Sequence, residues 1–111
     1  MVEVYVSAIS LLELELGVLL KERSDPTQGA MLRRWKDEVV SRKFAGRVLV
    51  VDQAVGETSA RLHVPDPRPA LDALIAATAI THGKTLVTRN IADFHGIPVR
   101  LIDPWALVAG R

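Results

Sequence analysis

Three acidic side chains stand where a parallel α/β sheet would bring them to one edge. Glu13 follows an expected first strand, Asp93 follows an expected strand at 85–88, and Asp72 lies in the first turn of an expected helix. Ligands of such sheets bind beyond the carboxyl ends of the strands. Carboxylates gathered there repel one another unless a cation neutralises them, and oxygen ligands select hard ions such as Mg²⁺ or Mn²⁺. The pattern therefore predicts a divalent-metal site suited to phosphoryl chemistry.

Each acid also has an ordinary structural explanation, which the sequence leaves open. Glu13 has capping-box spacing from Ser10. Asp72 would favour the positive end of a helix dipole, which stabilises by about 0.3–1 kcal/mol. Asp93 would cap a turn. The convergence of all three, rather than any one of them, favours the metal site.

Other catalytic chemistries have no support in the sequence. The chain has no cysteine, which excludes thiolate nucleophiles and cysteine-based metal centres. Glycine-rich nucleotide-binding motifs and the HExxH spacing of zinc proteases are missing too. The histidines are scattered, at positions His63, His82 and His95.

The charge of the chain is nearly balanced, at +1 for 111 residues, which argues against binding nucleic acid by bulk charge alone. Between residues 31 and 50, however, six basic residues face two acidic ones: Arg33, Arg34, Lys36, Arg42, Lys43 and Arg47 against Asp37 and Glu38. Two interpretations stay open. This segment is the solvated face of a helix, or it contacts a phosphate backbone or an acidic partner.

The elements that must position these residues alternate between strands and helices. The expected order is strand 2–7, helix from Ser10, helix from Pro26 to about Lys43, strand 48–51, helix from Asp52 to about His63, helix 71–81, strand 85–88 and strand 99–102. A proline-rich loop at 64–69 precedes the 71–81 helix, and Gly83 ends that helix. The order predicts one α/β layered domain with a largely parallel sheet.

Three further expectations concern packing and location. Gly17 lies in a helix that is apolar nearly all round, which predicts close packing at that glycine, and Trp105 is expected to pack back on the domain. Residues 1–10 lack a basic region, and no apolar run approaches the roughly 20 residues that span a bilayer. A cytoplasmic protein without a membrane anchor is therefore expected.

Four segments resemble the PIN domain, most closely the VapC/FitB-type toxins of bacterial toxin–antitoxin pairs. The segments are Val6–Gly17, Asp72–Ala79, Leu86–Phe94 and Asp103–Trp105, in the order of the family and over nearly the whole chain. The resemblance implies a Mg²⁺- or Mn²⁺-dependent ribonuclease, usually dimeric. It also implies a cognate antitoxin that binds DNA and inhibits the toxin.

The resemblance assigns roles to individual residues. Glu13, Asp72 and Asp93 match three of the four metal-binding catalytic acids. Polar residues that would support the site are Ser10, Thr88 and Asn90. Candidates for contact with nucleic acid are Arg89, Arg33, Arg34 and Lys36.

The chain departs from the family pattern at its start. The family's opening strand, which ends in an Asp-Thr-Asn-like motif and is central in the sheet, has no counterpart ahead of residues 2–7. The expectation is a PIN-like sheet with its central first strand absent, one metal-binding Asp missing, and strand edges that invite oligomerisation.

The functional alternatives follow from that departure. The first is a metal-dependent endoribonuclease toxin, with RNA as its expected nucleic-acid partner and DNA as the alternative partner. The second is a catalytically impaired PIN-like module that contacts nucleic acid or an antitoxin, and the third is a remnant reading frame without selected function.

Overall fold

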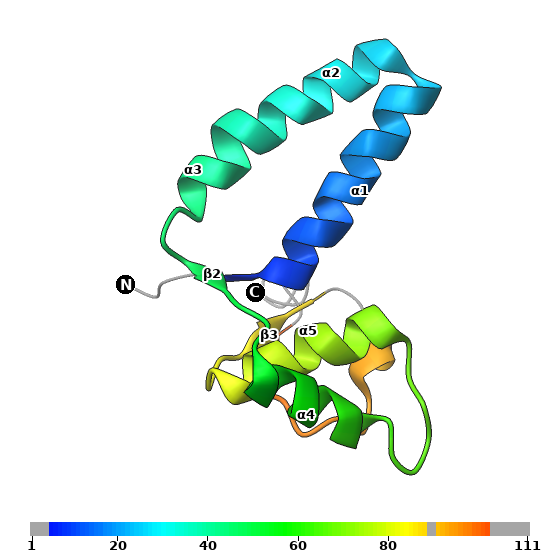
Figure 1. Cartoon of the computed structure of the whole chain (residues 1–111), viewed down its shortest axis with the longest axis vertical. Helices are drawn as coiled ribbons and strands as arrows, with labels where there is room; N and C mark the ends of the chain where they lie inside the picture. The colour runs from blue at the N-terminus through cyan, green and yellow to red at the C-terminus, as the bar shows by residue number, and fades with distance from the viewer. Residues whose placement is uncertain (1–4, 89–90, 103–111) are drawn as a thin grey trace, which may run out of the picture. The chain divides into compact units, whose positions relative to one another are not determined.

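The computed structural model describes residues 5–88 and 91–102, which divide between two compact units, Met1–Val50 and Val51–Arg111 (Figure 1). Each unit contains helices and one pair of short parallel strands. The predicted α/β class with parallel strands is therefore confirmed.

The first unit is built on a long helical hairpin. Its elements are β1 (Val6–Ser7), α1 (Ala8–Ser24), α2 (Pro26–Trp35), the π-helical turn η1 (Lys36–Val40), α3 (Ser41–Lys43) and β2 (Val48–Leu49). Asp25 caps α2 by accepting a hydrogen bond from the backbone N–H of Gln28, and Pro26 occupies the first helical position as predicted. β1 pairs with β2 in parallel, with Val6 opposite Val48.

The start of α1 differs from the prediction. The helix begins at Ala8, and the side chain of Ser7 accepts a hydrogen bond from the backbone N–H of Ile9 at 3.0 Å. Ser7 is the last residue of β1 and keeps extended dihedral angles, so the turn from strand to helix falls there. The expected capping box of Ser10 and Glu13 is wrong, because both residues already lie inside the helix.

Close packing in the hairpin occurs at Gly29 and not at Gly17. A Cβ atom added to Gly29 would lie 2.4 Å from the Cα atom of Glu22, so the backbones of α2 and α1 meet at this point. A Cβ added to Gly17 would meet nothing within 4 Å. The prediction for Gly17 was wrong because a sequence shows a glycine but not the element that packs against it.

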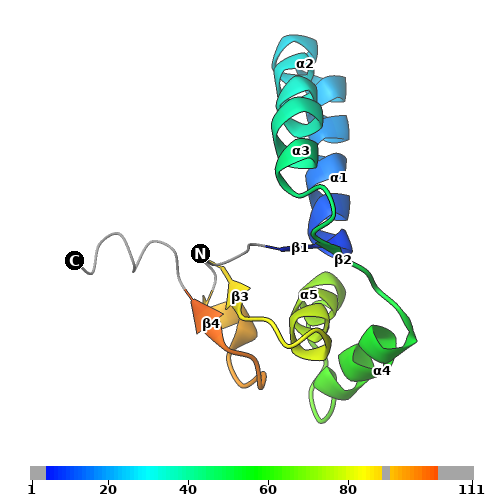
Figure 2. The ribbon, with the colours of Figure 1, turned by 90° about the vertical axis from the view of Figure 1, so that its left-hand side faces the viewer.

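The second unit carries α4 (Gln53–Leu62), α5 (Ala70–Thr81), β3 (Leu86–Val87), the 3₁₀ turn η2 (Ile91–Phe94) and β4 (Leu101–Ile102). Figure 2 shows α4 beside α5 and β3 beside β4. β3 pairs in parallel with β4, with Leu86 opposite Leu101. Asp52 caps α4 through the N–H of Val55, as predicted.

The core of the second unit forms where α5 meets the chain after β3. Ala76, Phe94 and Ile97 are buried together there. Half-buried apolar side chains surround them: Leu62, Ile80, Leu86, Val99 and Leu101. Small residues on α5 let its neighbours approach closely, and Gly83, at φ +67°, adopts the left-handed conformation that ends the helix.

Within the described residues, the strands predicted at 48–51, 85–88 and 99–102 are shorter than predicted, with two residues each. The first predicted strand, 2–7, lies partly outside the described residues, and the packing of Trp105 lies wholly outside them. The absence of the family's first strand stays a prediction. Across the described part of the chain, no helix combines the length and apolar character that a bilayer crossing requires.

The two glycines of the hairpin give the first test. Gly29→Ala forces α1 and α2 apart and should destabilise the protein by about 1–3 kcal/mol. Gly17→Ala, at an open helical position, should stabilise it by about 0.5–1 kcal/mol. Urea unfolding followed by circular dichroism measures both, and equal effects of the two substitutions would contradict the assigned packing.

Candidate functional site

Asp72 is held by the best-packed helix of the second unit. It is the third residue of α5, one turn before the buried Ala76. Ala73 beside it is fully buried, whereas Asp72 itself is only half-buried. The carboxylate therefore stands on a rigid support at the partly exposed N-terminal end of the helix.

Asp93 is held by the turn η2. The next residue, Phe94, is 5% exposed and belongs to the core, while Asp93 is exposed. The backbone N–H of Ile97 donates to the carbonyl oxygen of Phe94 at 3.1 Å, and the N–H of His95 donates to that of Ala92 at 3.2 Å. These bonds keep the turn closed and leave the Asp93 side chain at the surface.

The two carboxylates interact electrostatically. Burial raises the pKa of Asp72, and the negative charge of Asp93 raises it further. The structure thus brings Asp72 and Asp93 into one acidic pair, in which the charge of Asp93 disfavours ionisation of Asp72. A divalent cation is the natural counter-charge for such a pair.

Glu13 belongs to the first unit, where it is an exposed residue in the second turn of α1. Within the described residues of either unit, no three His, Asp or Glu side chains are gathered as a metal-binding group. The acidic pair on α5 and η2 is therefore the part of the predicted site that the structure brings together.

The predicted supporting residues fall in different places. Ser10 lies in the first turn of α1. Thr88 follows β3, is half-buried, and its backbone N–H donates to the carbonyl oxygen of Ile102 at 2.9 Å. Arg89 and Asn90 lie outside the described residues.

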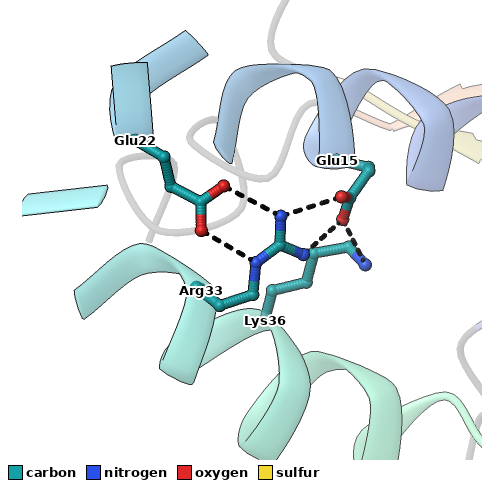
Figure 3. Close-up of polar contacts among 4 residues, drawn as sticks. All are labelled: Glu15, Glu22, Arg33 and Lys36. Carbon is teal, nitrogen blue, oxygen red and sulfur yellow. Dashed lines mark hydrogen bonds and ion pairs between the residues drawn. The ribbon is translucent and has the colours of Figure 1, made fainter. Parts of the chain in front are cut away.

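Arg33 and Lys36, two of the residues predicted to contact nucleic acid, form ion pairs within the protein (Figure 3). The guanidinium of Arg33 donates two hydrogen bonds to Glu15, at 2.7 and 2.8 Å, and two to Glu22, at 3.1 and 3.2 Å. The ammonium of Lys36 lies 3.0 Å from Glu15. These acids of α1 offset part of the positive charge counted between residues 31 and 50. Arg34, in contrast, is exposed.

Arg68 was not identified from the sequence, yet it contacts two parts of the second unit, the end of α4 and the segment after η2. Its side chain donates to the carbonyl oxygens of Leu62 and His95, and its backbone N–H donates to Nδ1 of His63. No motif spacing distinguishes this arginine. Its place between prolines, directly before an acid-bearing helix, was the available signal.

The chain belongs to the PIN domain family, whose model matches residues 1–98. It is 33% identical to the toxin FitB of Neisseria gonorrhoeae over 109 residues, covering 93% of this chain and 76% of that protein. It is 32% identical to the VapC ribonuclease Y4jK of Sinorhizobium fredii over 106 residues, covering 91% and 74%. A structure of FitAB bound to a DNA fragment matches with a TM-score of 0.82 and 31% identity, over 93% of this chain and 74% of that one. The predicted resemblance to VapC/FitB-type proteins is confirmed.

The acidic pair predicts a coupled titration. In Asp93→Asn the charge that opposes ionisation of Asp72 is lost, so the pKa of Asp72 should fall toward its ordinary value while burial keeps it somewhat above that value. Carbon-detected NMR titration of the side-chain carboxyl measures the change. Asp66→Asn, an exposed acid in the 64–69 loop, is the control and should leave Asp72 unaltered.

The ion pairs of Figure 3 predict a pH dependence of stability. Hydrogen bonds from Arg33 and then Lys36 lower the pKa of Glu15 from 4.5 to about 2. Because the folded value lies below the unfolded one, this stabilisation is present above pH 4.5 and is lost as the pH falls toward 2. Glu15→Gln should therefore lower the melting temperature at pH 7 and show a smaller further loss between pH 5 and 2. A parallel acid dependence in wild type and variant would contradict the assignment.

Proposed function

We propose that this chain is a divalent-metal-dependent endoribonuclease of the toxin–antitoxin type. The observation that carries the proposal is the interacting pair Asp72 and Asp93, set on α5 and η2 of a PIN domain. The similarity to a toxin and to a VapC ribonuclease supports the same reaction class.

The residues of the pair fit a hard divalent cation. Both offer carboxylate oxygens, which a hard cation prefers. Burial, and then the negative charge of Asp93, raises the pKa of Asp72. Mg²⁺ or Mn²⁺ would be held by Asp72 and Asp93, with Glu13 as the third acid carried over from the family. When bound, the ion would lower the pKa of a water molecule and stabilise charge on a phosphodiester.

The protein residues then have separate tasks. Asp72 and Asp93 bind in their ionised forms, so the cation competes with protons for the pair. Thr88, held against β4 through its backbone, and Asn90 would orient the loop after β3. Arg89, between them in sequence, would contact a substrate phosphate.

The same proposal names partners. An RNA substrate, a cognate antitoxin and a second copy of the chain are expected, in the cytoplasm. The similarity to FitAB, which its structure shows bound to DNA, supports an assembly with a DNA-binding antitoxin. On the hairpin, Arg34 is an exposed basic residue and is expected to contact nucleic acid.

A second candidate is a PIN-like binding module without turnover. The sequence leaves this alternative open, because Asp72 also suits the N-terminal end of a helix without a metal. Such a module would bind the antitoxin or nucleic acid equally well with and without Asp72.

Cleavage assays separate the two. With Mn²⁺ and a structured RNA, the protein should cleave, and Asp72→Ala should reduce the rate by at least about 100-fold, since loss of second-shell partners alone costs 10–100-fold. Asp37→Ala, an exposed acid of η1, is the matched control and should keep the wild-type rate. No cleavage by the wild type, with RNA binding unaffected by Asp72→Ala, would overturn the enzyme and support the module.

A further inference from the structure

Arg68 links the loop before α5 to the end of α4 and to the segment after η2. It lies in the proline-rich loop, one residue before Pro69, which is the N-cap of α5, and four residues before Asp72. Its Nε atom donates to the carbonyl oxygen of Leu62, the last residue of α4, at 3.2 Å. Its backbone N–H donates to Nδ1 of His63 at 3.1 Å. These bonds fix the entry of α5 relative to the end of α4.

The third bond of Arg68 crosses to the segment that carries the other acid. Its Nη1 atom donates to the carbonyl oxygen of His95 at 2.9 Å, 27 positions along the chain and two residues after Asp93. A Cβ atom added to Gly96 would lie 3.1 Å from Nη2, so the backbone after His95 passes directly against the guanidinium. Gly96 also has φ +83°, a left-handed conformation that favours glycine. Both this dihedral angle and the short distance to Arg68 therefore disfavour a side chain at position 96.

Apolar and polar contacts together hold η2 on α5. Phe94 and Ile97 anchor the turn and the segment after it in the core beside Ala76, and Arg68 bonds the backbone between these two residues. Asp93 lies directly before Phe94, and Asp72 lies between Arg68 and Ala76 along the chain. Arg68 therefore supplies the directional contact that two apolar anchors lack.

The contacts of Arg68 also argue against a purely electrostatic role. Its guanidinium donates hydrogen bonds to the backbone carbonyl oxygens of Leu62 and His95. The pKa of Asp72 is raised by burial and then by the charge of Asp93.

We propose that Arg68 is a positioning residue, which sets the separation of Asp72 and Asp93 by bridging the entry of α5 to the turn after η2. The effect of Arg68 on metal affinity rests on the proposed function, whereas its effect on the separation of the two acids does not. The planar guanidinium suits the task because its separate N–H groups reach two carbonyls at once, whereas a lysine ammonium offers a single centre.

The first experiment measures geometry without metal. The chain has no cysteine, so Ala70→Cys and Ala92→Cys, both at exposed positions, introduce two nitroxide labels beside the acids and leave the acids in place. Electron paramagnetic resonance should give a narrow distance distribution with Arg68 and a broader one with Arg68→Met. Arg68→Lys should lie between them. Gly96→Ala, which disturbs the same contact from the other side, should broaden the distribution independently.

The second experiment measures Mn²⁺ binding to the unlabelled full chain by water-proton relaxation, well below the melting temperature of each variant. Arg68→Met should weaken binding about 10–100-fold, the range found for residues that orient metal ligands. Arg61→Met, an exposed arginine on α4, is the matched control and should leave both measurements unaltered.

The outcomes are distinguishable. An unchanged distance distribution in Arg68→Met and Gly96→Ala would overturn the positioning role, whatever the metal does. A lower melting temperature with unchanged distances and Mn²⁺ affinity would also overturn it, since that result describes a merely structural residue. A broadened distribution in a protein whose wild type binds no Mn²⁺ would support the role of Arg68 and refute the proposed metal site.

Discussion

The electrostatic interaction of Asp93 with Asp72 depends on two separate supports in the second unit. Burial raises the pKa of Asp72, and the negative charge of Asp93 raises it further, so the chain holds the Asp72 carboxyl group where its ionisation is disfavoured. α5 supplies one support through a buried face of small residues. The other is a short turn pinned by Phe94 in the core and by Arg68 at its exit. Packing in the core thereby determines where the two carboxyl groups lie at the surface.

The first unit meets a different constraint, because its hairpin brings α1 and α2 together around charged side chains. Gly29 permits the backbones to touch, and the side chain of Arg33 spans Glu15 and Glu22 beside that contact. Exposed ion pairs contribute little to stability individually, but a shared arginine with two carboxylates restricts how the helices slide. These ion pairs thus fix the register of the hairpin, and they offset charge that the sequence alone would assign to nucleic-acid binding.

Sequence reasoning succeeded where the signal is local. Asp52, Pro26 and Gly83 mark helix ends through their own backbone and side-chain chemistry, and each does so in the structure. The predictions failed where a residue distant along the chain determines the local structure. Ser7 rather than Ser10 caps α1 because β1 extends to Ser7 through pairing with β2, more than 40 residues away along the chain. The convergence of Asp72 with Asp93 was predictable because both follow from the topology of a parallel α/β domain, whereas the placement of Glu13 beside them stays a prediction.

Membership of the PIN family and the state of the acidic pair constrain function in different ways. The family supplies a reaction class, since relatives that match over about three quarters of their length include a toxin and a VapC ribonuclease. The pair supplies a physical argument, because the negative charge of Asp93 raises the pKa of Asp72 and a divalent ion would offset that charge. Each acid alone would fit a structural role, whereas two acids on separately anchored segments would fit a cation. Their placement therefore supports the proposed metal-dependent chemistry.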